Sequence, residues 1–314
     1  MRKRILIYAT VLVVIGVAIA LRLIPWESLY TTSPQAYRRY QAQAAKKFKP
    51  KITEDATPDF ARIDHTSGRI FLFTHHHAAY YAIKKAQLEG RLPWRGNILI
   101  NFDSHDDANV PWQVPNPEDR DRATAFLKDP SLSLQVKLKR LRAFVHDDLN
   151  ITAWVLPLIE DGSLSAYYYV LPHRWPLTLA TSRSGVVNLK RWMAGEFVVL
   201  GPKPPRIAKG FQLDVVRAET LPSAQALAGK SVMVTFDMDY FSNADNLPME
   251  EDYEPRLPTA DQIRAEMATV VASLKARRLQ PPAILICESP GFTPLKQIPL
   301  IRDTLLADLK QAGF

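Results

Sequence analysis

Short apolar runs alternate along this chain with longer stretches in which apolar residues recur at helical spacing. The short runs are typical of strands buried on both faces of a sheet, whereas the longer stretches need only one apolar face. Alternating strands and helices favour a mostly parallel sheet with helices on both sides. The sequence therefore predicts the α/β class, as a three-layer α/β/α arrangement.

Most elements can be bounded from the pattern alone. Strands are predicted at Arg69–Phe73, Asn97–Phe102, Ile151–Ile159, Ala166–Leu171, Phe197–Leu200, Phe211–Ala218, Ser231–Asp237 and Pro282–Glu288. Helices are predicted at Ala78–Glu89, Asp261–Arg278 and Pro294–Ala312, the last entered through a Thr293-Pro294 cap. Loops are expected at the proline-rich Asn109–Pro130 and the acidic Asn243–Pro258.

One predicted strand runs into a cluster of metal-ligand side chains. Asn97–Asn109 reads N-I-L-I-N-F-D-S-H-D-D-A-N, so Asp103, His105 and Asp107 follow the apolar run at a spacing of two. Side chains at i, i+2 and i+4 of an extended segment point the same way. The carboxyl end of a strand is also where open α/β sheets bind their ligands.

A second strand ends in the same manner. Ser231–Phe241 reads S-V-M-V-T-F-D-M-D-Y-F, and its apolar run leads to Asp237 and Asp239. Either cluster alone could be a polar turn or a helix cap. Two strands of one sheet would bring both clusters together, and one or two divalent cations would offset the repulsion between their carboxylates.

These residues carry a resemblance to a known family. F-D-S-H-D-D-A-N and T-F-D-M-D resemble the second and third metal motifs of the ureohydrolase superfamily of arginases, agmatinases and deacetylases. The chain is most similar to a branch that includes peptide arginases. That branch has an apolar residue before x-F-D-S-H-x-D, a W-x-L-P segment and an S-P-x-[YF]-T-P segment, here Ile100–Asp107, Trp154–Pro157 and Ser289–Pro294. The resemblance covers roughly Arg69 to Phe314 and implies an arginase-like fold.

The first metal motif of the family is a histidine at a strand-to-helix corner, and Thr74–His77 is such a corner. Setting His76 on the family histidine aligns Ala79 and Ile83 with the family's small and apolar helix positions. The aspartate and glycines that normally precede this histidine are absent, so its two neighbours remain candidates.

By the resemblance, Asp103 and Asp237 bridge two ions. The implied metal ligands are His76, Asp103, His105, Asp107, Asp237 and Asp239. Four carboxylates balance two dications, and two imidazoles without a thiolate favour Mn²⁺ over Zn²⁺. Such a pair would share a hydroxide that attacks a trigonal carbon. The implied reaction is hydrolysis of a linear amidine C–N bond in a small guanidino compound or an arginine-containing peptide, with peptidyl arginine giving ornithine and urea.

The resemblance also assigns residues to substrate binding and catalysis. Asn109, two residues beyond Asp107, corresponds to a substrate-contacting asparagine, although a turn asparagine fits equally well. Glu288, which ends a predicted strand, corresponds to the glutamate that pairs with the guanidinium, with a turn cap as the alternative. His146 is the first histidine after Asn109 and the candidate for the proton-shuttling histidine, although a surface position suits it better. The predicted catalytic residues are Asp107, Glu288 and His146.

Two other functions use the same residues. A zinc-dependent deacetylase or amidohydrolase of the same fold would hold one Zn²⁺ with Asp103, His105 and one of the later aspartates. Two histidines of His75–His77 would then act as acid and base. Such a site does not need Asp107 or both later aspartates. The third possibility is a non-catalytic metal-binding domain, against which the complete ligand set argues.

Charge is divided unevenly along the 314 residues, whose formal net charge is +8. Residues 1–51 hold ten Lys/Arg and one acid, whereas the remaining 263 residues hold 30 Lys/Arg and 31 acids. The globular part thus has no domain-wide basic face, and nucleic acid is not an expected partner. Cys287 is the single cysteine, so no intramolecular disulfide can form.

The N-terminal segment has the features of a membrane anchor. Ile5–Leu21 is an uncharged run of 17 residues that follows three basic ones. An uncleaved signal-anchor is favoured, although Ala18–Ala20 also fits a signal-peptide cleavage site. The predicted organisation is an anchor or signal peptide at residues 1–26, a basic polar linker at 27–58 and an arginase-like catalytic domain at 59–314. Basic residues before the run place the N-terminus in the cytoplasm, so the domain is expected to be membrane-anchored and extracytoplasmic (periplasmic).

Overall fold

The computed structural model describes residues 69–314 apart from 112, 174–184, 197–202, 244–256 and 291. The predicted anchor at 1–26, the linker at 27–58, the strand at 197–200 and most of the loop at 243–258 lie outside the described residues. No helix among the described residues is long and apolar enough to cross a membrane. The unit described below belongs to the compact part of the chain from Lys51 to Phe314.

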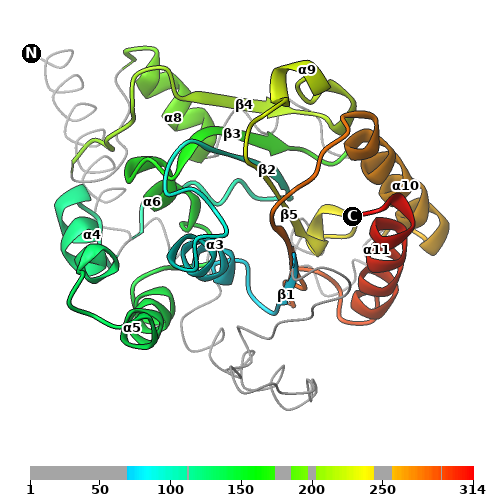
Figure 1. The fold of residues 1–314 in the computed structure, drawn as a ribbon. Helices are drawn as coiled ribbons and strands as arrows, with labels where there is room; N and C mark the ends of the chain where they lie inside the picture. Colours follow the sequence, from blue (N-terminus) through cyan, green and yellow to red (C-terminus); the bar gives the residue numbers. More distant parts are fainter. Residues whose placement is uncertain (1–68, 112, 174–184, 197–202, 244–256, 291) are drawn as a thin grey trace, which may run out of the picture. The chain divides into compact units, whose positions relative to one another are not determined.

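Among the described residues, six strands form one sheet (Figure 1). The strands are β1 Ile70–Phe73, β2 Asn97–Phe102, β3 Leu164–Val170, β4 Gln212–Val216, β5 Val232–Asp237 and β6 Ile284–Cys287. Their order is β1-β6-β5-β2-β3-β4, and every neighbouring pair is parallel. The prediction of an α/β fold with a parallel sheet is therefore confirmed.

Helices cover both faces of this sheet. The helices are α3 Ala78–Leu88, α4 Pro117–Thr124, α5 Leu134–Asp147, α6 Val155–Glu160, α8 Gly185–Met193, α9 Ala224–Leu227, α10 Ala260–Ala276 and α11 Ile298–Ala312, with 3₁₀ turns η2 Ala125–Lys128, η3 Ala218–Thr220 and η4 Met238–Tyr240. Leu99, Tyr167 and Met233 face one way from three strands and share a core with residues of α3, α5 and α6. Helices α10 and α11 pack on each other and lie on the other side of the sheet (Figure 1).

The strand order places two predicted ligand clusters side by side. Strands β2 and β5 are neighbours, and Phe102 is in register with Phe236. The residues that follow, Asp103 and Asp237, therefore leave adjacent strands at the same edge. From β2 the chain continues to β3 on one side, whereas from β5 it continues to β6 on the other. This divergence is the kind of switch point at which open α/β sheets bind ligands.

The predicted strand at Ile151–Ile159 is wrong, because residues 151–154 form no strand and Val155–Ile159 belong to the short helix α6. Val155 to Ile159 are buried on all sides, so the segment shows no polar face that would reveal its helical period. Pro157 stands in the first turn, where the backbone N–H has no partner within the helix in any case.

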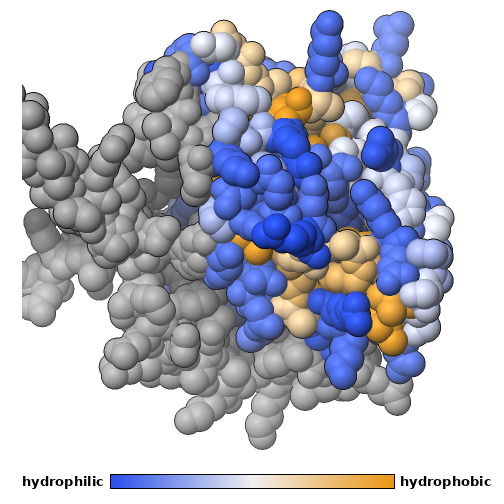
Figure 2. Space-filling view, turned by 90° about the vertical axis from the view of Figure 1, so that its left-hand side faces the viewer, coloured by the Kyte–Doolittle hydropathy of each residue, from blue (hydrophilic) through white to orange (hydrophobic). Residues whose placement is uncertain are grey.

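Two other boundaries also differ from the prediction. The expected loop at Asn109–Pro130 contains α4, which is charged and buries only Pro117 and Arg120. Arg120 holds the helix in place through its ion pair with Glu160, whose N–O distances are 2.5 and 2.8 Å, so no apolar stripe is needed. The side of the molecule that carries α4 is largely hydrophilic (Figure 2). Helix α11 begins at Ile298, after Gln297, rather than at the Thr293-Pro294 pair.

Candidate metal centre

The segment that follows β2 bends back on itself. Asp107 has a φ of 49°, in the left-handed region that residues other than glycine seldom adopt. Asp106 stabilises the bend, because its Oδ1 accepts from the Ala108 N–H at 3.1 Å and its Oδ2 from the Val186 N–H at 2.9 Å, in the first turn of α8. The ligand side chains therefore converge through a bent loop and not through the extended chain that their spacing suggested.

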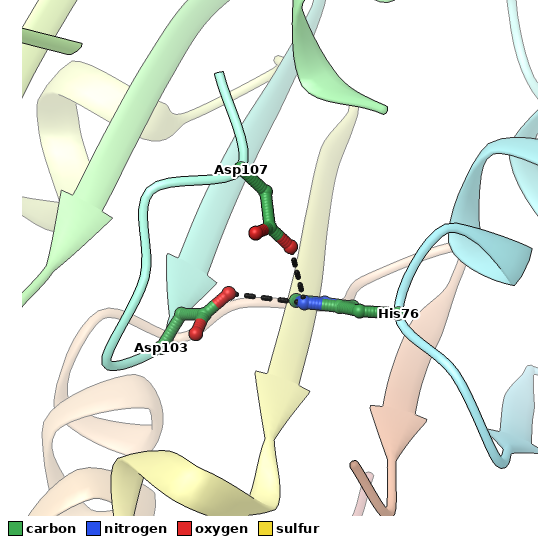
Figure 3. Close-up of side chains that lie close together, drawn as sticks. All are labelled: His76, Asp103 and Asp107. Atoms are coloured by element: carbon green, nitrogen blue, oxygen red, sulfur yellow. Dashed lines mark ion pairs between the residues drawn. The ribbon is translucent and has the colours of Figure 1, made fainter. Parts of the chain in front are cut away.

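A first group of side chains surrounds His76, in the corner between β1 and α3. Its Nδ1 lies 3.0 Å from Asp103 Oδ2, 2.8 Å from Asp107 Oδ2 and 3.3 Å from Asp237 Oδ2. The two aspartates of the β2 loop approach the imidazole from different directions (Figure 3). His76, Asp103 and Asp107 are buried and could together hold a metal ion.

A second group shares Asp103 with the first. His105 Nδ1 lies 2.9 Å from Asp239 Oδ2 and 3.9 Å from Asp103 Oδ1, and these three residues could also hold a metal ion. The side chain of His105 is 31% exposed, whereas those of Asp103 and Asp239 are fully buried. Solvent therefore reaches the centre on the His105 side.

The hydrogen bonds of His76 fit a metal ligand. Its Nε2 lies 2.7 Å from the Thr235 hydroxyl, which can accept a hydrogen bond from Nε2–H in the tautomer that leaves a lone pair on Nδ1. Nδ1 makes no well-formed hydrogen bond, although three carboxylate oxygens surround it. A lone pair that faces carboxylates is unfavourable unless a cation lies between them. Metal-binding histidines commonly donate their other ring N–H in this way.

Electrostatics lead to the same conclusion. Burial raises the pKa of Asp103 well above its usual value, and the charges of Asp107, Asp239 and Asp237 raise it further. Burial, followed by the charge of Asp239, raises the pKa of Asp237 to about 6. Burial alone would lower the pKa of His76, but the Asp103 charge and the close approach of the Asp107 and Asp237 carboxylates outweigh burial and raise it. Negative charge is thus concentrated in a buried volume, and a divalent cation would neutralise it.

Side chains from distant segments support the ligands. Trp154 donates from its indole Nε1 to Asp107 Oδ2 at 2.6 Å, and Ser289 donates from Oγ to Asp237 Oδ2 at 2.5 Å. Both residues belong to segments on which the family resemblance rests, but the resemblance assigned no role to either residue. Thr235 is the first residue of the T-F-D-M-D motif, but the resemblance assigned it no role.

Of the three neighbouring histidines, His76 is the one whose ring meets the carboxylates. The rings of His75 and His77 stack on each other, with centroids 6.0 Å apart. Burial, followed by the charge of His75, lowers the pKa of His77 to about 3. Neither ring belongs to the two groups described above.

Glu288 points away from this centre. Asp237 and Cys287 are in register on neighbouring strands, so Cys287 lies on the side of Asp237 and the next residue faces the opposite way. Glu288 Oε1 instead accepts from Arg302 Nη1 of α11 at 3.1 Å. Burial raises the pKa of Glu288, and the Arg302 charge opposes this effect.

The structure does not gather the other two predicted residues into the centre either. The side chain of Asn109 is exposed, and its backbone N–H donates to the Thr152 carbonyl at 3.1 Å. His146 lies near the end of α5, with a side chain that is 64% exposed and an Nδ1 that is 2.8 Å from Asp147 Oδ1. The resemblance assigned both by order along the chain, which does not determine where a side chain lies.

No protein-family model matches the chain, and a search of curated proteins finds no match. The chain is similar to the crystal structure of the arginase of Helicobacter pylori at 12% sequence identity, with a TM-score of 0.35. The match covers 77% of this chain and 72% of that one.

Proposed function

We propose that this chain is a metal-dependent hydrolase that uses a pair of divalent cations to cleave a guanidino group and release urea. One observation carries the proposal. The six side chains expected from the motifs lie together, in two groups that share Asp103. A site for one ion does not need both Asp107 and Asp239. This holds for an isolated metal-binding turn and for a one-metal deacetylase site.

In this proposal His76 and Asp107 hold one cation and His105 and Asp239 hold the other, with Asp103 and Asp237 between them. The donor set of oxygens and imidazoles favours Mn²⁺. When bound, the cations supply Lewis acidity and lower the pKa of a water molecule so that it can attack at neutral pH.

The protein itself positions these groups and controls access. Trp154 and Ser289 fix the two aspartates to which they donate, and Thr235 fixes the ring of His76. The substrate enters on the side of His105, because the other ligand side chains are almost completely buried. Glu288 could bind a substrate guanidinium only if it exchanged its partner Arg302 for the substrate.

The proposed substrate is a guanidino compound, either small or an arginine residue in a peptide. The family motifs support this class. The predicted membrane anchor lies outside the described residues and does not enter the proposal.

Elemental analysis and a urea-release assay test the proposal together. We expect about two Mn²⁺ per chain after reconstitution, and urea from at least one of arginine, agmatine and an arginine-containing peptide. Asp107→Ala should lose cation and activity, whereas Asp214→Ala, at an exposed position, should retain both. One Zn²⁺ per chain that is unaffected by Asp107→Ala, together with acetate from acetyl-lysine, would contradict the proposal and support a deacetylase.

A further inference from the structure

Three polar side chains lie in one row across the sheet, directly beneath the candidate metal centre. Thr235 of β5, Asn101 of β2 and Tyr169 of β3 are in register on neighbouring strands. The three residues are buried, and the strand positions on either side of them are mostly apolar. We call Thr235, Asn101 and Tyr169 the polar row.

Each member of the polar row bonds to a different part of the centre. The Thr235 hydroxyl lies 2.7 Å from His76 Nε2, Asn101 Nδ2 donates to Asp103 Oδ2 at 3.2 Å, and the Tyr169 hydroxyl donates to the Ser104 carbonyl at 2.8 Å. The polar row thus holds the imidazole of His76, the carboxylate of Asp103 and the loop that follows Asp103.

Asn101 is the central member and has the most unusual environment. Its second N–H donates to the Tyr167 hydroxyl at 2.9 Å, and that hydroxyl donates in turn to the Asp106 carbonyl at 2.6 Å. The amide oxygen of Asn101 is buried and has no hydrogen-bond partner among the described residues. Rotating the amide by half a turn would not help, because its oxygen would then face the Asp103 carboxylate.

An unsatisfied buried acceptor destabilises the folded state, so Asn101 is not explained by stability. A leucine of nearly the same shape would suit this position in the sheet better. The bonds that Asn101 does make restrain Asp103, whose Oδ1 accepts from the His105 N–H at 2.8 Å while its Oδ2 accepts from Asn101. The carboxylate is therefore held from both sides, with Oδ2 toward His76 and Oδ1 toward His105.

We propose that Asn101 and Tyr167 are positioning residues that set the orientation of the Asp103 carboxylate for two cations. The inference rests on the proposed cation binding but concerns different residues. Residues that hydrogen-bond to metal ligands typically change the metal affinity by about 10- to 100-fold when they are removed.

Asn101→Leu tests the inference through two readouts. Titration with Mn²⁺ should show an affinity about 10- to 100-fold weaker than that of the wild-type protein. The melting temperature of the metal-free variant should stay close to that of the metal-free wild type, because loss of the unsatisfied acceptor offsets loss of the hydrogen bonds to Asp103 and Tyr167. A side chain with only a structural role would lower the melting temperature and leave the affinity unchanged. Asn101→Ser, which is too short to reach Asp103, provides a second variant if the leucine variant does not fold.

Two adjacent tyrosines of β3 supply a matched control. Tyr167→Phe removes the hydroxyl that binds Asn101 and Asp106, and should also weaken Mn²⁺ binding. Tyr168→Phe removes a hydroxyl that bonds to Gln212 on the opposite face, and should leave binding unchanged. Wild-type affinity in the Asn101 variants would overturn this inference alone. Absence of Mn²⁺ binding by the wild-type protein would overturn it together with the proposed function.

Discussion

Asp107 depends on a single indole for its orientation. Its backbone is in the left-handed region, and its Oδ2 lies between His76 Nδ1 at 2.8 Å and Trp154 Nε1 at 2.6 Å. A hydrogen bond from a neutral donor to a carboxylate is stronger than one between neutral groups. The indole therefore fixes which oxygen of Asp107 faces the centre.

Trp154→Phe removes this donor and keeps an aromatic ring in the core. We expect Mn²⁺ affinity to fall by about 10- to 100-fold and the free energy of unfolding by about 1–3 kcal/mol. Trp94→Phe is the matched control, because Trp94 is 41% exposed and its side chain does not reach the ligands. Calorimetric titration and urea denaturation measure the two effects. Equal Mn²⁺ affinity in both variants would show that the indole does not support the centre.

The candidate ligands could be picked out at this scale, but the residues that contact them could not. Asp103, His105 and Asp107 are close in sequence, so their spacing after an apolar run is informative. Trp154 is separated from Asp107 by 47 residues in the sequence, and Thr235 from His76 by 159 residues. No local sequence pattern reveals contacts over such separations. The direction of Glu288 depends on its register with another strand, which sequence alone does not give.

Helix α8 packs closely against the loop that follows β2. A Cβ added to Gly185 would lie 2.8 Å from the backbone carbon and oxygen of Ala108. The next residue, Val186, donates its N–H to Asp106 in the same loop. Glycine is therefore required at this position because the two backbones touch.

Gly185→Ala should push the start of α8 away from the loop. We expect the free energy of unfolding to fall by about 1–3 kcal/mol, as in other overpacked sites, and Mn²⁺ affinity to fall with it. Lys190→Ala on the same helix removes only an exposed ion pair and should change both quantities little. Urea denaturation with and without Mn²⁺ separates the two effects. A Gly185→Ala protein with wild-type stability and affinity would mean that the loop and helix adjust freely.

Prediction of whole elements succeeded for most of the short apolar strands and for helices α3, α10 and α11, whereas helices α5 and α8 were not predicted. Helix α10 has a clear apolar stripe and was predicted to within about two residues of its observed ends. Helix α6 was mistaken for a strand because all of its faces are buried, and α4 was missed because an ion pair rather than an apolar face holds it. These errors arise from tertiary contacts.

On the scale of the whole sheet, the candidate centre joins segments that are distant along the chain. His76 follows β1, the loop with Asp103 follows β2, and Asp237 ends β5. The strand order makes β2 and β5 neighbours. Strand β6 separates β1 from β5, and the corner after β1 that holds His76 lies at the same edge of the sheet. Without a cation, the buried aspartates repel one another across these connections.

Cation binding should therefore stabilise the whole unit that contains the sheet. A ligand that binds only the folded state adds about 2.7 kcal/mol at a concentration 100-fold above its Kd. For a domain of this size, that corresponds to a rise in melting temperature of about 5–10 °C. We expect EDTA-treated protein to gain this much when Mn²⁺ is added, as followed by scanning calorimetry. Asp239→Asn should show a much smaller gain, whereas Asp303→Asn, exposed on α11, should behave like the wild-type protein. The same melting temperature with EDTA and with saturating Mn²⁺ would mean that the buried aspartates do not bind the ion, and that protons must neutralise them instead.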